Sequence, residues 1–60
     1  MKKILTISEA AHYLRISKSL LYQLVERQEI KHIRINRRIL FDAELLDQYI
    51  ENHTVAVGVG

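Results

Sequence analysis

Two helix-start signals lie very close together in this chain, and their spacing is the strongest constraint on how it can fold. Thr6 opens a Thr-x-x-Glu capping box, in which the threonine hydroxyl and the glutamate carboxylate each accept a hydrogen bond from a backbone N–H. Apolar residues then recur at helical spacing as far as Leu14. Ser17 is the next strong N-cap candidate. The sequence therefore predicts two helices connected by little more than Arg15 and Ile16.

This connection is too short for the two helices to lie side by side in antiparallel orientation. A sharp turn between crossed helices satisfies it, which is a helix-turn-helix arrangement. In the first helix, Ala10 and Ala11 are small enough to let the two helix axes approach closely. In the second helix, Leu21, Leu24 and Val25 share one face and are expected to be buried.

After Arg27 the apolar period changes from that of a helix to that of a strand, which indicates a β-hairpin. Asn36 tolerates the left-handed backbone conformation that a tight turn demands, so we place the tip of the hairpin there. The side chains expected to face the helices are those of Ile33, Ile35, Ile39 and Phe41. Arg34 and Leu40 are expected on the outer face.

A third helix is predicted after the hairpin, with Asp42 as its N-cap. Its apolar stripe consists of Leu45, Leu46, Tyr49 and Ile50. The expected fold class is mostly α with a small β-hairpin: a winged helix-turn-helix, in which a helix-turn-helix is followed by a two-stranded wing and a third helix. We expect one domain over residues 1–53 and a C-terminal tail over residues 54–60, which either is flexible or forms a short strand through Val55 and Val57.

The charge of the chain is unevenly distributed, although its net value is only +2. Residues 15–38 contain seven basic side chains and two acidic ones, a net charge of +5. From residue 39 onward there are four acidic side chains and no lysine or arginine. Binding of a polyanion depends on the local positive field rather than on the total charge. Residues 15–38 are therefore the candidate region for contact with a polyanion.

Composition limits the other classes of function. Sixty residues allow one small domain of marginal stability, and the absence of cysteine removes disulfides and thiolate metal sites. No apolar run is long enough to span a bilayer and no signal peptide follows Met1, so we expect an intracellular, cytoplasmic protein without membrane contact. The histidines at 12, 32 and 53 lack metal-ligand spacing. We expect no catalytic residue, no metal and no cofactor, and therefore no enzyme, because so small a domain rarely forms a catalytic pocket.

Two stretches, LTISEAAHYLRISKSLLYQLV and IRINRRILFDAELLDQYIE, carry these signals within residues 5–51. Over this span the chain resembles the excisionase-type, MerR-like family of winged helix-turn-helix domains. The resemblance implies DNA binding, with the second helix in the major groove and the wing along the backbone or in the adjacent minor groove. Such domains commonly carry glycine in the turn, after the second helix and at the wing tip, where this chain has Arg15, Gln28 and Asn36. Positive φ angles at Arg15 and Gln28 would cost about 1 kcal/mol each, whereas asparagine adopts them readily.

The residues predicted to contact DNA lie on the second helix, at its two ends and on the wing. A rotation of about 100° per residue places Ser19, Tyr22 and Gln23 opposite the buried face of that helix. In helix-turn-helix docking, the N-terminal half of the second helix reaches the base edges. The complete predicted set is Arg15, Ser17, Lys18, Ser19, Tyr22, Gln23, Arg27, Arg34, Asn36, Arg37 and Arg38.

Side-chain chemistry suggests roles within this set. Gln23 can form two hydrogen bonds with adenine, and Lys18 suits a guanine edge or a phosphate. Tyr22 offers a hydroxyl to phosphate and a ring to a sugar or a thymine methyl, or else it packs at the edge of the core. Arg37 and Arg38 can enter a minor groove or bind phosphates, unless they are merely solvated turn residues. If about five phosphates are neutralised, log affinity falls with log salt at a slope of roughly −4 to −5.

These features predict a sequence-specific double-stranded DNA-binding protein associated with the nucleoid. The resemblance favours an excisionase-type recombination directionality factor that binds and bends DNA with an integrase. The alternatives are a small transcriptional regulator and a protein-interaction module that docks through the acidic third helix. A single small domain binds DNA with modest affinity, so we also expect cooperative self-association through Leu40 and the tail. Otherwise Val55 or Val57 covers Leu40 within the same chain.

Overall fold

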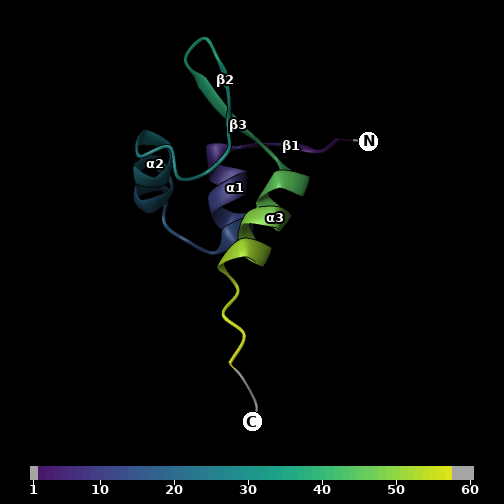
Figure 1. Ribbon diagram of the computed structural model, residues 1–60. Coiled ribbons are helices and arrows are strands. Elements are labelled where there is room, and N and C mark those ends of the chain that lie inside the picture. The colour runs from purple at the N-terminus through teal and green to yellow at the C-terminus, as the bar shows by residue number, and fades with distance from the viewer. Residues whose placement is uncertain (1, 58–60) are drawn as a thin grey trace.

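The computed structural model describes residues 2–57, which form three helices and one three-stranded antiparallel sheet. Along the chain the elements are β1 (Ile4–Thr6), α1 (Ile7–Leu14), α2 (Lys18–Glu26), β2 (Ile33–Ile35), β3 (Arg38–Asp42) and α3 (Ala43–His53). Figure 1 shows α1 in the centre with α2 and α3 on its two flanks, and the β2–β3 hairpin projecting beyond the helices as a wing. The predicted winged helix-turn-helix fold is confirmed.

All three helices begin at the predicted N-caps. The capping box is complete, because Thr6 Oγ1 accepts from the backbone N–H of Glu9 (3.2 Å) and Glu9 Oε1 accepts from the N–H of Thr6 (2.9 Å). The Ser17 hydroxyl oxygen accepts from the N–H of Leu20 at 3.1 Å. Asp42 caps α3 by accepting from the N–H of the second helical residue. Local capping chemistry therefore sets the start of each helix.

The two turns and the wing tip use left-handed backbone conformations. Among the described residues, the non-glycine residues with positive φ are Arg15 (57°), Gln28 (57°) and Asn36 (54°). These are the positions at which the family resemblance implies glycine. Arg15 ends α1 and turns the chain, so that the N–H of Ile16 donates to the carbonyl of Ala11 at 3.0 Å. The chain therefore forms the sharp turn without glycine, and the Cβ atom of Arg15 makes this left-handed conformation sterically unfavourable.

Gln28→Gly is expected to raise the free energy of unfolding by about 0.5–1 kcal/mol, because glycine adopts positive φ without a Cβ clash. The greater flexibility of the unfolded glycine chain offsets part of the gain. Urea denaturation followed by circular dichroism measures the change. Gln28→Ala is the control, since it keeps the Cβ atom and should unfold near the wild-type midpoint. Equal midpoints for the two variants would contradict strain at this position.

The strand β1 is the one element that the sequence does not predict, because Ile4 and Leu5 form only a two-residue apolar run. It pairs with β3, which makes β3 the central strand. Its residues Ile4, Leu5 and Thr6 lie opposite Asp42, Phe41 and Leu40. A two-stranded ribbon alone is barely stable, so this third strand helps to fasten the wing to the helices.

The register of the wing corrects the expected division of its faces. The paired residues are Ile33 with Leu40, Arg34 with Ile39, and Ile35 with Arg38, which leaves Asn36 and Arg37 as a two-residue turn. Directly opposed residues of an antiparallel pair share a face. Ile33 and Ile35 therefore lie with Leu40 on the outer face, and Arg34 shares the face of Ile39 and Phe41.

The prediction that Ile33 and Ile35 point toward the helices, and Arg34 away from them, was wrong. It required a turn with an odd number of residues, whereas the turn contains two. Because side chains alternate along a strand, a shift by one residue moves every side chain to the other face. The expectations for Ile39, Phe41 and Leu40 agree with the observed register.

The core lies between the helices and one face of the sheet. Its buried apolar side chains are Leu5, Ala10, Ala11, Leu21, Val25, Ile30, Phe41 and Leu46. Ala10 and Ala11 are buried where α1 packs against its neighbours, as their small size predicts. On α3, Leu46 is buried, whereas Ile50 is 42% exposed and lies at the edge of the predicted stripe.

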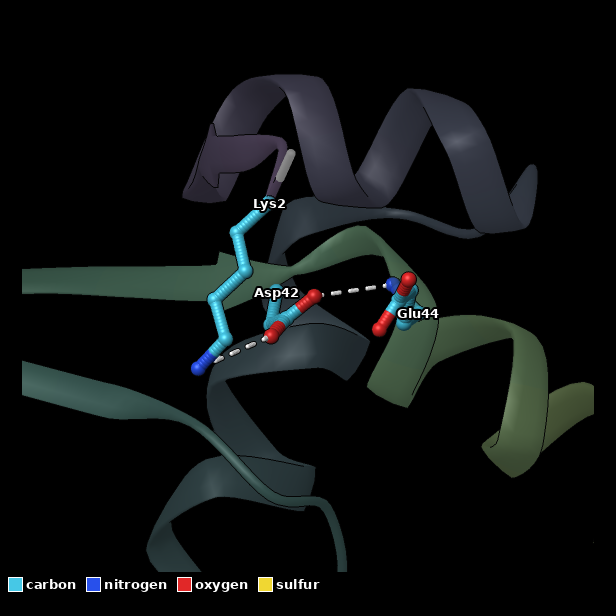
Figure 2. Close-up of polar contacts among 3 residues, drawn as sticks. All are labelled: Lys2, Asp42 and Glu44. Atoms are coloured by element: carbon cyan, nitrogen blue, oxygen red, sulfur yellow. Dashed lines mark hydrogen bonds and ion pairs between the residues drawn. The ribbon is translucent and has the colours of Figure 1, made fainter.

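Asp42 connects β1, β3 and α3. Its Oδ1 accepts from the N–H of Glu44 at 2.9 Å, and its Oδ2 lies 3.8 Å from Lys2 Nζ. Figure 2 shows these two contacts on opposite sides of the carboxylate. The N–H of Ala43 also donates to the carbonyl of Lys3 at 2.9 Å. One buried carboxylate thus caps α3 and tethers the residues that precede β1.

The tail leaves α3 at the end of the molecule opposite the wing (Figure 1). Residues 54–57 form neither helix nor strand, and Val55 and Val57 are 83% and 82% exposed. Neither valine covers Leu40, which rules out that alternative. Residues 58–60, the rest of the predicted tail, lie outside the described residues.

Tyr13 joins α1 to α3, because its hydroxyl donates a hydrogen bond to the Asp47 carboxylate. This hydrogen bond raises the pKa of Tyr13 above its ordinary value of 10.0. A folded-state pKa above the unfolded value contributes stability below the unfolded pKa, and this contribution is lost as the pH rises through the folded pKa. We therefore expect the free energy of unfolding to fall above about pH 10.

An ultraviolet titration of tyrosinate, compared with Asp47→Asn, measures this shift. The asparagine variant is expected to bring the pKa of Tyr13 back toward its ordinary value. Identical titration curves for the two proteins would contradict the contact between Tyr13 and Asp47.

Candidate nucleic-acid interface

The helix α2 presents one apolar face to the core and one polar face to solvent. Leu21 and Val25 are buried and Leu24 is partly buried against the core, as the helical spacing predicts. The exposed polar residues on and beside the opposite face are Lys18, Ser19, Tyr22, Gln23 and Glu26, and Leu20 is also 41% exposed. The capping hydroxyl of Ser17 fixes where this helix begins and so fixes the rotation of the exposed face.

A hollow of about 300 Å³ lies between α2 and the wing. Tyr22 lines it from α2, and Arg37 and Arg38 line it from the wing tip. Its remaining lining comes from Thr6, Ile7, Ile39 and Leu40. Because Tyr22 of α2 and both tip arginines line the same hollow, the exposed face of α2 meets the wing tip there, and we treat the two as one surface. We call it the α2–wing surface: Lys18, Ser19, Tyr22, Gln23, Arg37 and Arg38.

This surface is strongly cationic on the side of the wing. Its wing residues Arg37 and Arg38 are both basic, and residues 30–41 contain no Asp or Glu. In the part of the chain that the structure describes, the ion pairs are Arg27 with Glu29 (3.9 Å) and Lys2 with Asp42 (3.8 Å). Arg37 and Arg38 therefore have no carboxylate partner among residues 2–57, and their charge is available to an external anion.

All eleven residues of the predicted DNA-contacting set are exposed. Tyr22, Arg37 and Arg38 line the hollow, whereas Lys18, Ser19 and Gln23 are exposed on α2 and Asn36 shares the wing turn with Arg37. The other four lie away from the hollow or already have a local structural role. Ser17 uses its hydroxyl oxygen to cap α2, and Arg27 caps the end of α2 and pairs with Glu29. Arg15 lies in the turn between α1 and α2, and Arg34 lies on the wing face opposite that of Arg38. The contacts of all eleven residues with DNA stay predictions.

Sequence reasoning missed the residues that connect the two halves of this surface. Thr6 was assigned only to helix capping, yet it also lines the hollow beside Arg38 and Leu40. The cause is β1, which places Thr6 directly opposite Leu40. Because the sequence gives no signal for β1, it gives none for this proximity.

Three of the seven acidic residues of the chain gather on α3, although Glu26 lies on the exposed side of α2. Glu44, Asp47 and Glu51 are exposed on α3. Figure 1 shows α3 on the flank of α1 away from α2. The two signs of charge are therefore separated in space as well as in sequence, which orients the cationic side toward a polyanion.

A winged helix-turn-helix fold in which the second helix and an arginine-tipped wing share one cationic surface defines a DNA-binding helix-turn-helix protein. The protein-family model described as "helix-turn-helix domain" matches residues 4–54, so the chain belongs to that family. No similar curated protein and no similar solved structure was found. Within residues 2–57, no helix has the length and apolar character needed to cross a membrane.

Proposed function

We propose that this protein recognises a specific double-stranded DNA sequence and acts as an excisionase-type recombination directionality factor, which binds and bends DNA beside an integrase. The observation that carries the proposal is the hollow lined by Tyr22, Arg37 and Arg38, because it places the reading helix and the wing side by side. Membership of the helix-turn-helix family supports DNA binding. The resemblance of residues 5–51 to excisionase-type domains supports the role in recombination.

In this proposal the N-terminal half of α2 reads base edges in the major groove. Gln23 hydrogen-bonds an adenine, and Lys18 contacts a guanine edge or a phosphate. Arg37 and Arg38 enter the adjacent minor groove or bind its phosphates. The protein acts by binding alone, without a catalytic residue, metal or cofactor, and works in the cytoplasm on the nucleoid.

A single domain with one reading helix covers few base pairs and binds with modest affinity. We therefore propose that several copies bind cooperatively to repeated sites. Leu40 is partly exposed on the outer face of the wing, and the tail, which carries the exposed Val55 and Val57, extends from the far end of the molecule (Figure 1). These exposed valines of one copy are candidates for contact with the outer wing face of the next.

The test is a protection footprint combined with a bending assay on an attachment-site duplex, with and without the integrase that acts on that site. We expect protected sites, a bent duplex, and a rise in excision relative to integration when the protein is added. Cooperative binding would appear as a steep increase in occupancy with protein concentration. Unchanged recombination together with altered transcription from a bound promoter would instead support the transcriptional regulator.

A further inference from the structure

Ile35 is the most exposed large apolar side chain in the helices and strands of residues 2–57, with 54% of its surface accessible. It is the last residue of β2 and stands directly before the two-residue turn of Asn36 and Arg37. The turn length places it on the outer face of the wing, together with the partly exposed Ile33 and Leu40. An apolar strip therefore runs along the outer face and ends at the tip.

The surroundings of this side chain are cationic. Arg38 lies directly opposite Ile35 across the strand pair, and Arg34 and Arg37 lie within two residues of it in the chain. None of these arginines has a carboxylate partner among the described residues. The tip thus combines one apolar side chain with three free positive charges on a narrow ribbon.

Residues of the outer face of the wing reach the hollow. By register, Thr6, Arg38 and Leu40 lie on the same face of the sheet as Ile35. All three of them line the hollow that Tyr22 of α2 also lines. Ile39 of the opposite face lines it too, so a duplex that covers the hollow meets the wing at its tip, where Ile35 is paired with Arg38.

We propose that Ile35 is an apolar wedge that enters the minor groove with the tip arginines, packs against its deoxyribose walls and bends the duplex. The walls of that groove consist of sugar carbons, which an isoleucine side chain can contact. A row of phosphates lies on each side of the groove, where the arginines beside Ile35 can bind. Proteins that bend DNA through the minor groove insert apolar side chains past these walls and between base steps, which kinks the duplex. The inference rests on the proposed DNA-binding function and adds the residue that produces the bend.

A protein partner is the competing occupant of the same face. A stable protein interface needs about 800 Å² on each side, whereas the tip is a two-stranded ribbon closed by two residues. Such a ribbon fits a groove better than it fits a flat surface. The free arginines also favour a partner with regularly spaced anions over one with a mixed surface.

The test compares Ile35→Thr with the wild type on a duplex that the wild-type protein has selected from a randomised pool. Threonine keeps the β-branched shape that suits a strand, so the wing should form. Energy transfer between dyes at the two ends of the duplex reports the bend. Ile35→Thr is expected to bind about 5- to 10-fold more weakly and to lose most of the end-to-end shortening. Ile35→Val is expected to keep both properties.

Ile4→Thr is the matched control, because Ile4 lies on the same face of the sheet, is 44% exposed and stands far from the tip. It should bind and bend DNA as the wild type does. Failure of the pool to yield any selected duplex would refute sequence-specific binding itself. If Ile35→Thr binds and bends like the wild type, the wedge is refuted and DNA binding stands. A loss confined to cooperativity, with the bend of a single complex unchanged, would assign Ile35 to a protein contact instead.

Discussion

Replacing both tip arginines by glutamate, in Arg37→Glu/Arg38→Glu, is expected to weaken binding to duplex DNA by at least about 100-fold, because juxtaposed like charges cost several kcal/mol. Both side chains are exposed, line the hollow beside Tyr22 and lack a carboxylate partner among residues 2–57. The dependence of log affinity on log salt is expected to become shallower by about 2, since each phosphate contact contributes about 1. Fluorescence anisotropy at several salt concentrations measures both quantities.

Lys31→Glu is the control for net charge in this experiment. Lys31 belongs to the same basic segment and is exposed, but it lines a different hollow beside Leu45 of α3. We expect its reversal to change affinity far less than Arg37→Glu or Arg38→Glu does alone. Equal losses for all three single variants would mean that only the total charge matters, which would contradict a defined α2–wing surface.

Charge reversal on α3 separates DNA binding from a protein-interaction function. Glu44→Lys/Glu51→Lys changes two exposed carboxylates and leaves Asp47, which binds the Tyr13 hydroxyl, in place. If DNA recognition is the function, this variant keeps its activity in a recombination assay while Arg37→Ala/Arg38→Ala loses it. The reverse pattern would favour an interaction module that docks through the acidic helix.

Features determined by chemistry within a few residues could be predicted from the sequence. Thr6, Ser17 and Asp42 cap the three helices because each side chain needs only a backbone N–H two or three residues away. Arg15 and Gln28 adopt positive φ where the family pattern implies glycine. The exposed face of α2 follows from the helical period alone.

Features that depend on strand pairing could not be predicted. Whether Ile35 faces the core or the solvent depends on whether the turn contains two residues or three. The sequence INRR is compatible with both turn lengths. β1 contains only three residues, and its pairing partner lies more than thirty residues away in the chain. The individual site residues could therefore be predicted, but the hollow between them could not, because Thr6 reaches Leu40 only through β1.

Phe41→Ala is expected to leave the protein largely unfolded at room temperature. Phe41 is fully buried on the central strand β3, opposite Leu5, and β3 packs against both α1 and α3. Removing a buried aromatic side chain costs about 3–5 kcal/mol. A domain of this size rarely has more than about 3–5 kcal/mol of stability to lose. The loss therefore matches the whole stability of the fold, and urea denaturation followed by circular dichroism would show little or no folded baseline.

Phe41→Leu retains most of the apolar volume and is expected to stay folded with a lower urea midpoint. Ile50→Ala is the control on α3, since its side chain is 42% exposed and its loss should cost less than about 1 kcal/mol. Because the ring of Phe41 fastens the wing to the helices, Phe41→Ala should also lose DNA binding, even though residue 41 does not line the hollow. A cooperatively folded Phe41→Ala that binds DNA normally would show that β1 and the caps suffice to position the wing, and would contradict this role of the ring.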